Sequence, residues 1–234
     1  MINKNKVLGI IPARGGSKGI PRKNLKLLAG KPLIAWTIEE AKKSQHLDRL
    51  ILSSDDPEII ITAKSWGCEA PFLRPAELAR DDTPGIEPVI HALYQLGEHY
   101  DYVVLLQPTS PLRTVEDIDC CIRYCLQEGA PACISVSLTD KHPYWMHTID
   151  ERHRLQPLFP TAQSIQRRQD LPLVYIENGA VYVAQKDFLL NMKSFTTVET
   201  LAYIMPPERS WDIDNESDFF YCSLLKGGSH DITS

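Results

Sequence analysis

The sequence contains no long hydrophobic run and no excess of basic residues. No stretch approaches the roughly 20 uninterrupted apolar residues that a membrane-spanning helix needs. Lysine and arginine number 25 against 30 aspartates and glutamates, which gives a net charge of −5, whereas a general nucleic-acid binder presents a basic face. Residues 1–6 lead straight into a strand pattern rather than a signal peptide. We therefore expect a cytoplasmic protein that binds neither membrane nor nucleic acid.

Cysteines in metal-binding or redox-active spacing are also missing. The 6 cysteines form no Cys-x-x-Cys pair, and three of them, Cys120, Cys121 and Cys125, fall in one predicted helix. We expect all of them to be reduced, buried, small apolar side chains rather than zinc ligands or disulfides.

Neither of two familiar phosphate-binding motifs is present, although the first strand is followed by a glycine-rich loop. The loop reads Ala13-Arg14-Gly15-Gly16-Ser17-Lys18-Gly19-Ile20-Pro21-Arg22-Lys23-Asn24. A Walker A loop has four residues between its glycines and then Gly-Lys-Ser/Thr, but only three residues separate Gly15 from Gly19, and Ile20 follows. The dinucleotide motif Gly-x-Gly-x-x-Gly fails because Ser17 stands at its second glycine.

Anion binding is nevertheless the chemistry that this loop favours. Glycines let backbone N–H groups approach a ligand closely, and cationic side chains add charge-assisted hydrogen bonds. The cations are Arg14, Lys18, Arg22 and Lys23. A solvated basic turn is the alternative, but cations this dense are unusual in a chain of net negative charge. We expect the loop to bind phosphate.

The hydrophobic pattern predicts an α/β fold. Strand patterns at 7–11, 49–54, 102–106 and 132–137 alternate with helix patterns at 31–41, 57–66, 86–98 and 115–127. This alternation indicates a doubly wound, mostly parallel sheet that binds ligands beyond the C-terminal ends of its strands. With 43% apolar residues, the chain is expected to form a single domain, 1–234, around one core.

The regular alternation stops between residues 140 and 173. This segment is polar, aromatic and proline-bearing, and a structureless loop of that length is unusual in a compact domain. We expect an arm or hairpin that meets a partner subunit. Strands at 178–183 and 200–205 and helices at 185–191 and 215–226 complete the predicted elements.

A pair of aspartates near the C-terminus forms a second candidate site. In an extended segment, residues two apart face the same side, so Asp212 and Asp214 point together while Ile213 turns toward the core. Two carboxylates suit Mg²⁺, which takes one or two of them together with waters and substrate phosphates. An equally simple interpretation makes Asp214 the N-cap of the last helix and leaves Asp212 solvated.

Taken together, these motifs show a resemblance to a known family. The blocks are the loop 11–24, Arg74-Pro75-Ala76-Glu77-Leu78-Ala79, Leu106-Gln107-Pro108-Thr109-Ser110-Pro111-Leu112-Arg113, Asn178-Gly179-Ala180 and Asp212-Ile213-Asp214. Because these blocks come in the family's order, the chain resembles the acylneuraminate (CMP-sialic acid synthetase-type) cytidylyltransferases. The resemblance implies a three-layer nucleotide-diphospho-sugar transferase (Rossmann-like) fold, Mg²⁺ dependence and a homodimer whose arms, 140–173, mediate dimerisation.

The resemblance also implies a reaction, in which CTP and a nine-carbon 2-keto sugar acid give the CMP-sugar acid and pyrophosphate. N-acetylneuraminate or legionaminate is the expected acid. The residues that it implies for binding CTP are Arg14, Ser17, Lys18, Arg22, Lys23, Asn24 and Arg74. Those that it implies for the sugar acid are Gln107, Arg168, Asn178 and Tyr182, although Tyr182 could equally be a core residue.

Catalysis is expected to depend on Arg14, Lys18, Lys23 and Asp214. Preorganised cations stabilise the charge that grows on the phosphate oxygens as pyrophosphate leaves. The sequence offers no evident general base, so we expect a metal held by Asp212 and Asp214 to lower the pKa of the attacking hydroxyl.

Two departures from the family pattern leave the sugar acid open. Trp145 stands where some relatives carry a lysine near the sugar carboxylate, and Pro84-Gly85 replaces a serine that contacts cytosine, with Asp82 and Thr83 close enough to substitute. Alternatives are therefore a cytidylyltransferase for pseudaminate or an eight-carbon acid, or a non-catalytic nucleotide-binding domain.

Overall fold

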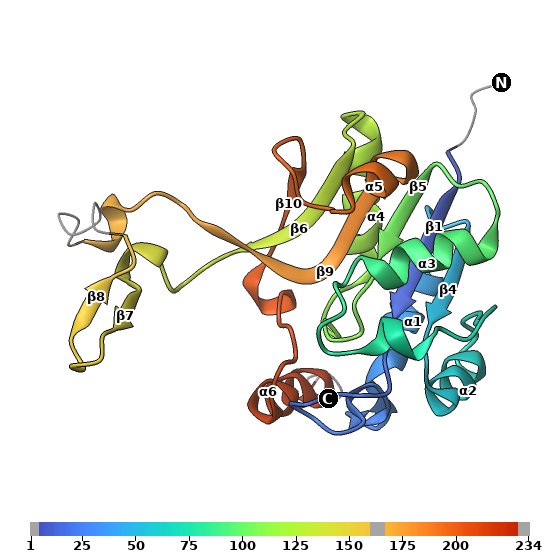
Figure 1. Cartoon of the computed structure of the whole chain (residues 1–234), viewed down its shortest axis with the longest axis horizontal. Helices are drawn as coiled ribbons and strands as arrows, with labels where there is room; N and C mark the ends of the chain where they lie inside the picture. The colour runs from blue at the N-terminus through green and yellow to red at the C-terminus, as the bar shows by residue number, and fades with distance from the viewer. Residues whose placement is uncertain (1–4, 160–166, 229–234) are drawn as a thin grey trace, which may run out of the picture.

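A computed structural model describes residues 5–159 and 167–228, except for the side chain of Arg168 (Figure 1). The strands are β1 (Val7–Pro12), β2 (Leu27–Leu28), β3 (Lys31–Pro32), β4 (Arg49–Ser53), β5 (Tyr102–Leu105), β6 (Ala132–Leu138), β7 (His147–Ile149), β8 (Leu155–Pro157), β9 (Tyr175–Gln185) and β10 (Leu201–Met205). The α-helices are α1 (Leu33–Lys42), α2 (Pro57–Ser65), α3 (Glu87–Leu96), α4 (Val115–Gln127), α5 (Lys186–Met192) and α6 (Glu216–Gly227).

The central sheet is mostly parallel. Its six strands lie in the order β10-β6-β9-β5-β1-β4, and β9 is antiparallel to both of its neighbours. The other neighbouring pairs are parallel, so β1, β4, β5, β6 and β10 end at the same edge of the sheet. The predicted α/β architecture is confirmed.

Helices cover both faces of the sheet because the strand side chains alternate between two apolar clusters. In β1, Val7 and Ile11 face the cluster that contains buried residues of α1, α2 and α4. Leu8 and Ile10 face the opposite cluster, which contains residues of α3 and α5. A buried parallel strand is apolar on both faces, and this is why the run 7–11 contains no polar side chain.

A third apolar cluster joins the glycine-rich loop to the C-terminal helix. Ile20 and Leu28 pack with Ile213, Phe219 and Cys222, and all of these side chains are buried. Figure 1 shows α6 beside the loop that follows β1. Segments nearly 200 residues apart in the sequence are therefore held together by burial of apolar side chains.

The segment between β6 and β9 leaves the sheet as an arm that ends in a hairpin (Figure 1). Strands β7 and β8 pair antiparallel, with Ile149 opposite Leu155. Ile149 is 66% exposed and Leu155 is 65% exposed. Many other apolar side chains of the arm are exposed as well. Exposed apolar patches of this kind are typical of protein–protein contacts.

Two local predictions differ from the structure. The expected helix at 31–41 begins at Leu33, because Lys31 and Pro32 pair with Leu28 and Leu27 in a short hairpin. The N-cap of α6 is Asn215 rather than Asp214. The Asn215 side chain accepts hydrogen bonds from the backbone of Ser217 and Asp218, which frees Asp214 from a capping role.

The prediction of buried cysteines is confirmed for five of the six. All six cysteines are free thiols, and only Cys120 is less than fully buried. Within residues 5–159 and 167–228, no helix has the length and apolar character required to cross a membrane.

Candidate active site

A cavity of about 250 Å³ opens beyond the C-terminal ends of β1, β4 and β5. It lies where the fold class predicts a ligand site. Arg14 follows β1 and Gln107 follows β5, while Arg74 and residues of the loop 76–85 close the other side. The lining residues are Pro12, Arg14, Arg74, Leu78, Arg80, Asp81, Thr83, Gly85, Pro88, Leu105 and Gln107.

Two predicted phosphate ligands share one carboxylate. A guanidinium nitrogen of Arg14 lies 2.7 Å from one oxygen of Asp81, and the Lys18 ammonium lies 2.8 Å from the other. The two cations hold the pKa of Asp81 below its ordinary value, with the hydrogen bond from Lys18 as the main cause. The positions of Arg14 and Lys18 are therefore suited to gripping one anion between them.

Arg74 and Asn24 are two buried polar residues next to Arg14. Arg74 is 3% exposed, and its guanidinium donates to Asp55 at 3.2 Å, while Asp55 also accepts from the Gly15 amide at 3.2 Å. Burial lowers the pKa of Arg74, and Asp55 opposes that shift. The Asn24 amide donates to the Arg14 carbonyl at 3.0 Å. Asp55 and Asn24 thus fix the peptide group between Arg14 and Gly15, one through its N–H and the other through its carbonyl.

Lys23 connects the loop to the aspartate pair. Its ammonium donates to the Ile213 carbonyl at 2.6 Å and interacts with the carboxylates of Asp212 and Asp214. Burial lowers the pKa of Lys23, and the two aspartates oppose this shift. A side chain at Gly19 would collide with the carbonyl of Asp214. The glycine therefore permits a close approach of the two predicted sites.

Asp212 carries the least satisfied carboxylate in this region. Its Oδ1 atom is buried without a hydrogen-bond partner among the described residues. Burial raises the pKa of Asp212 above the ordinary value of 3.8, and Asp214 raises it further, while Thr109 and Lys23 oppose the shift. A buried oxygen without a partner is costly unless something else binds it.

The aspartate pair fits the predicted Mg²⁺. Oxygen ligands suit this ion, and one or two protein carboxylates are sufficient when phosphates and waters complete its coordination. The described residues contain no group of three or more Asp, Glu, His or Cys side chains that could hold a metal by themselves. Ligands from a bound substrate would therefore be needed beside Asp212 and Asp214.

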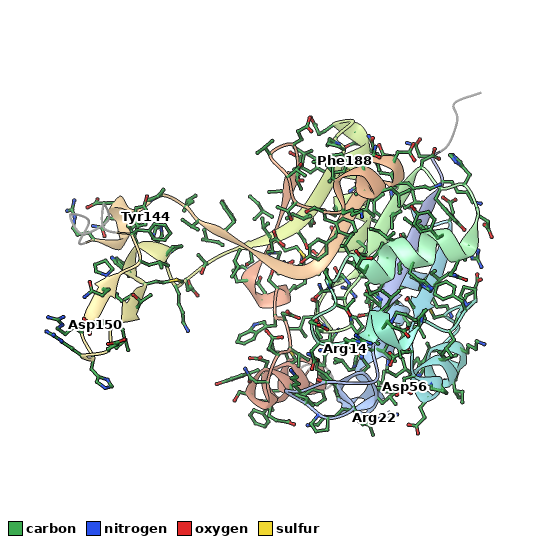
Figure 2. The ribbon with its side chains drawn as sticks, in the orientation of Figure 1. Arg14, Arg22, Asp56, Tyr144, Asp150 and Phe188 are labelled. Carbon is green, nitrogen blue, oxygen red and sulfur yellow. The ribbon has the colours of Figure 1, made fainter. Side chains whose placement is uncertain are left out.

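Arg22 points toward α2 rather than toward the cavity. Its guanidinium contacts Asp56 at 2.6 Å and also pairs with Glu58, both in the first turn of that helix or at its cap. Figure 2 labels Arg22, Asp56 and Arg14 in this part of the molecule. A nucleotide contact from Arg22 would require this ion pair to open.

The other predicted nucleotide ligands have different surroundings. Thr83 lines the cavity and donates to the Glu77 carbonyl at 3.1 Å, whereas Asp82 is exposed and does not line it. Ser17 is half-buried within the loop, between Arg14 and Lys18 in the sequence. Their roles in binding CTP stay predictions.

Gln107 and Tyr182 come from neighbouring strands of the sheet. Gln107 lines the cavity, and a side chain at Gly179 would lie 2.9 Å from its Oε1 atom, so β9 approaches it closely. Tyr182 is half-buried, with its ring 5.5 Å from that of Phe195. Burial raises the pKa of Tyr182 to about 12, and Glu177 and Asp212 add to the shift.

Asn178 and Arg168 complete the predicted sugar ligands. Asn178 is 4% exposed and makes hydrogen bonds with both ends of its amide inside the protein. Arg168 begins a short 3-10 helix, Arg168–Asp170, but its side chain lies outside the described part of the chain.

Asp81 and Asp55 are the charged residues that sequence reasoning missed. Asp55 lies two residues after the end of β4, and a polar residue just beyond a parallel strand is a signal that could have identified it. Asp81 lies in a loop with no periodic pattern, and the sequence gives no sign that its carboxylate meets Arg14 and Lys18.

Comparisons with known proteins find similar sequences and a similar solved structure. A family model described as "Cytidylyltransferase" matches residues 8–206. The chain is 36% identical over 217 residues to the N-acylneuraminate cytidylyltransferase of Escherichia coli O18:K1:H7, an alignment that covers 92% of this chain and 51% of that protein. This chain therefore spans about half the length of that relative.

Two further proteins match over nearly their whole length. The chain is 36% identical over 226 residues to the CMP-N,N'-diacetyllegionaminic acid synthase of Legionella pneumophila subsp. pneumophila, with 92% of this chain and 93% of that protein covered. A solved structure of a CMP:2-keto-3-deoxy-manno-octonic acid synthetase complexed with CTP superposes with a TM-score of 0.73, covering 96% of this chain and 99% of the other at 17% identity. The latter similarity confirms the predicted fold.

Proposed function

This chain belongs to the cytidylyltransferase family, and on that premise we propose that it transfers CMP from CTP to a nine-carbon 2-keto sugar acid. The acid is N-acetylneuraminate or legionaminate, the CMP group is joined to its anomeric hydroxyl, and pyrophosphate is released. The observation that carries this proposal is the convergence of Arg14, Lys18 and Lys23 with the Asp212–Asp214 pair at one edge of the sheet.

The proposed reaction is an in-line displacement at the α-phosphorus of CTP. The anomeric oxygen forms the new bond to phosphorus as the bond to the leaving pyrophosphate breaks. Arg14 and Lys18 bind the phosphates, and Lys23 adds positive charge at the junction with the aspartate pair. Asp212 and Asp214 would hold Mg²⁺, which supplies further positive charge to phosphate oxygens when bound. Gln107 and Tyr182 orient the sugar acid beside β9.

A substrate screen tests this proposal. Purified protein is incubated with CTP, Mg²⁺ and one candidate acid at a time, and pyrophosphate release is measured. We expect the highest kcat/KM with N-acetylneuraminate or a legionaminate. A preference for pseudaminate or an eight-carbon acid would reassign the substrate. CTP binding without pyrophosphate release from any acid would leave only a nucleotide-binding domain.

Asp81 is expected to compete with the triphosphate for the cations. Because its carboxylate pairs with Arg14 and Lys18, the phosphates of CTP must take its place. We predict that Asp81→Asn lowers the Kd for CTP about threefold, a modest change because the pair is solvent-exposed. Isothermal titration calorimetry without sugar acid measures this, with Glu77→Gln in the same loop as the control. Weaker binding by Asp81→Asn would instead assign Asp81 a role in presenting the cations to the ligand.

We also propose that the arm mediates a homodimer. Ile149 and Leu155 form an exposed apolar pair on one face of the β7–β8 hairpin, and burial against a second copy would remove this surface from water. We predict that the double variant Ile149→Asp/Leu155→Asp is monomeric at micromolar concentrations in analytical ultracentrifugation. Thr148→Asp, one residue away on the other hairpin face, is the matched control and should remain dimeric. An unchanged dimer in the double variant would place the interface elsewhere.

We place the reaction in the cytoplasm, where CTP is available. The six free cysteines fit a reducing compartment.

A further inference from the structure

The Asn178 side chain has no hydrogen-bonding capacity left for a ligand. A primary amide offers two acceptor positions on its oxygen and two N–H donors. The Asn178 oxygen accepts from the Ser135 hydroxyl at 2.6 Å and from the Ala180 backbone N–H at 3.1 Å. Its nitrogen donates to the Ser210 hydroxyl at 2.9 Å and to the Met205 sulfur at 3.4 Å.

The orientation of this amide is fixed by its partners. The Ala180 backbone N–H can only donate, so the atom that meets it must be the Asn178 oxygen. The nitrogen therefore faces Ser210. With 4% of the residue exposed, Asn178 is a buried link between three segments: β6, β9 and the chain that follows β10.

Ser210 stands two residues before Asp212, in a segment with little regular structure. Between the short 3-10 helix Pro207–Arg209 and α6, the chain has no backbone ladder to fix its path. The Ser210 hydroxyl accepts from Asn178 and donates to the Pro206 carbonyl at 2.9 Å. Hydrogen bonds from individual groups, together with the buried side chain of Ile213, therefore determine where the following carboxylates lie.

Further anchors hold the same segment. The Lys23 ammonium donates to the Ile213 carbonyl at 2.6 Å, and the Asp214 backbone N–H donates to the Asp218 carboxylate at 3.0 Å. Arg209 makes a two-point contact with the buried carboxylate of Asp117, at 3.0 and 2.8 Å. The Ile213 amide donates to the Thr109 carbonyl at 2.9 Å. Of these anchors, the Asn178–Ser210 hydrogen bond is the one that reaches the segment from the middle of the sheet.

We propose that Asn178 is a positioning residue for the aspartate pair, acting through Ser210, and not a ligand of the sugar acid. The proposal rests on the function proposed above, because it assigns Asp212 and Asp214 the task of holding the divalent metal. Its physical basis is that a carboxylate pair binds a metal well only when both oxygens are held in place before the metal arrives. Misplacement by about 1 Å can cost a large factor in rate.

Ser210→Ala is the sharpest test, because it removes the link and leaves Asn178 and the other anchors in place. We expect kcat to fall about tenfold and the Kd for Mn²⁺ to rise by a similar factor, with the KM for the sugar acid unchanged. Mn²⁺ binding is measured by electron paramagnetic resonance in the presence of CTP and without sugar acid, so it does not depend on turnover. Ser65→Ala is the matched control, because Ser65 makes a similar hydrogen bond to the Thr62 carbonyl in α2.

Asn178→Ala and the double variant with Ser210→Ala complete the experiment. Because both residues act through one link, the double variant should bind Mn²⁺ no more weakly than Asn178→Ala alone. A raised KM for the sugar acid with unchanged Mn²⁺ binding in Asn178→Ala would overturn the proposal in favour of a direct sugar contact. Mn²⁺ binding by Ser210→Ala equal to that of Ser65→Ala would also overturn it, even if Asn178→Ala does not fold. Absence of turnover in the unmodified protein would refute the proposed function alone, since the Mn²⁺ comparison still reports on the link.

Discussion

Arg14→Ala should lower kcat/KM by about 10²–10³-fold, the range measured when one preorganised donor to a developing negative charge is removed. Arg14 lines the cavity, and the Asn24 amide fixes its carbonyl, so its guanidinium is held ready for an anion. The same change should leave the melting temperature within about 2 °C, because an exposed ion pair contributes little to stability. Steady-state kinetics beside thermal melts would check both parts.

Lys26→Ala is the matched control for this experiment. The side chains of Lys26 and Arg14 are both 36% exposed, and each pairs with one carboxylate, but Lys26 meets Glu216 outside the cavity. We expect its kcat/KM to stay within about twofold of the unmodified protein, since the ion pair with Glu216 and the contact with the Phe219 ring both lie outside the cavity. Equal losses of activity in the two variants would mean that Arg14 acts through general electrostatics. A large fall in melting temperature for Arg14→Ala alone would mean that it acts through stability.

The sequence was sufficient for elements whose signals are local. The helix predicted at 115–127 is α4, because an amphipathic run follows a capping box between Thr114 and Asp117. The strand predicted at 7–11 is β1 with one residue added, because an apolar run of that length fits a strand covered on both faces. The mostly parallel sheet follows from the alternation of such elements.

Contacts between distant segments could not be read from the sequence. The pairing of Arg14 with Asp81 joins residues 67 positions apart, and no periodic pattern relates them. Asn178 is a second example of a contact between distant segments that the sequence does not reveal. Its place in a motif suggested a ligand contact, yet Ser135 and Ser210, from two other segments, occupy its amide. The residue types in the site were predictable, but which side chains remain available to a ligand depends on the packed fold.

Asp212→Asn is expected to raise the stability of the unliganded protein and to lower its activity. In the absence of metal, the buried Asp212 oxygen has no partner among the described residues, and Asp214 places a second negative charge nearby. Asn keeps nearly the same shape without the charge. Thr109 and Lys23 offset only part of the cost of this buried charge, so its removal should stabilise the unliganded protein at pH 7. Turnover should fall about 10²–10³-fold, because a metal ligand is lost.

The raised pKa of Asp212 determines how the stability gained by Asp212→Asn changes with pH. The folded protein holds the pKa of Asp212 above its ordinary value of 3.8, so folding disfavours the ionised carboxylate. The resulting destabilisation is absent below pH 3.8, grows as the pH rises through the folded-state pKa, and is complete above it. Urea unfolding in the presence of a chelator should therefore show a larger stability advantage for Asp212→Asn at pH 7 than near pH 4. Glu199→Gln, at an exposed carboxylate, is the control.

Binding of Mg²⁺ and CTP should make the unmodified protein more stable than Asp212→Asn. Mg²⁺ and CTP added together bind only the folded state and should raise the melting temperature of the unmodified protein by more than that of Asp212→Asn. The buried charge of Asp212 would then destabilise the folded protein only without ligands, because the bound metal and nucleotide compensate it. If the variant were less stable than the unmodified protein with chelator at pH 7, Asp212 would be satisfied by its own surroundings, and its role as a ligand for Mg²⁺ would lose its physical basis.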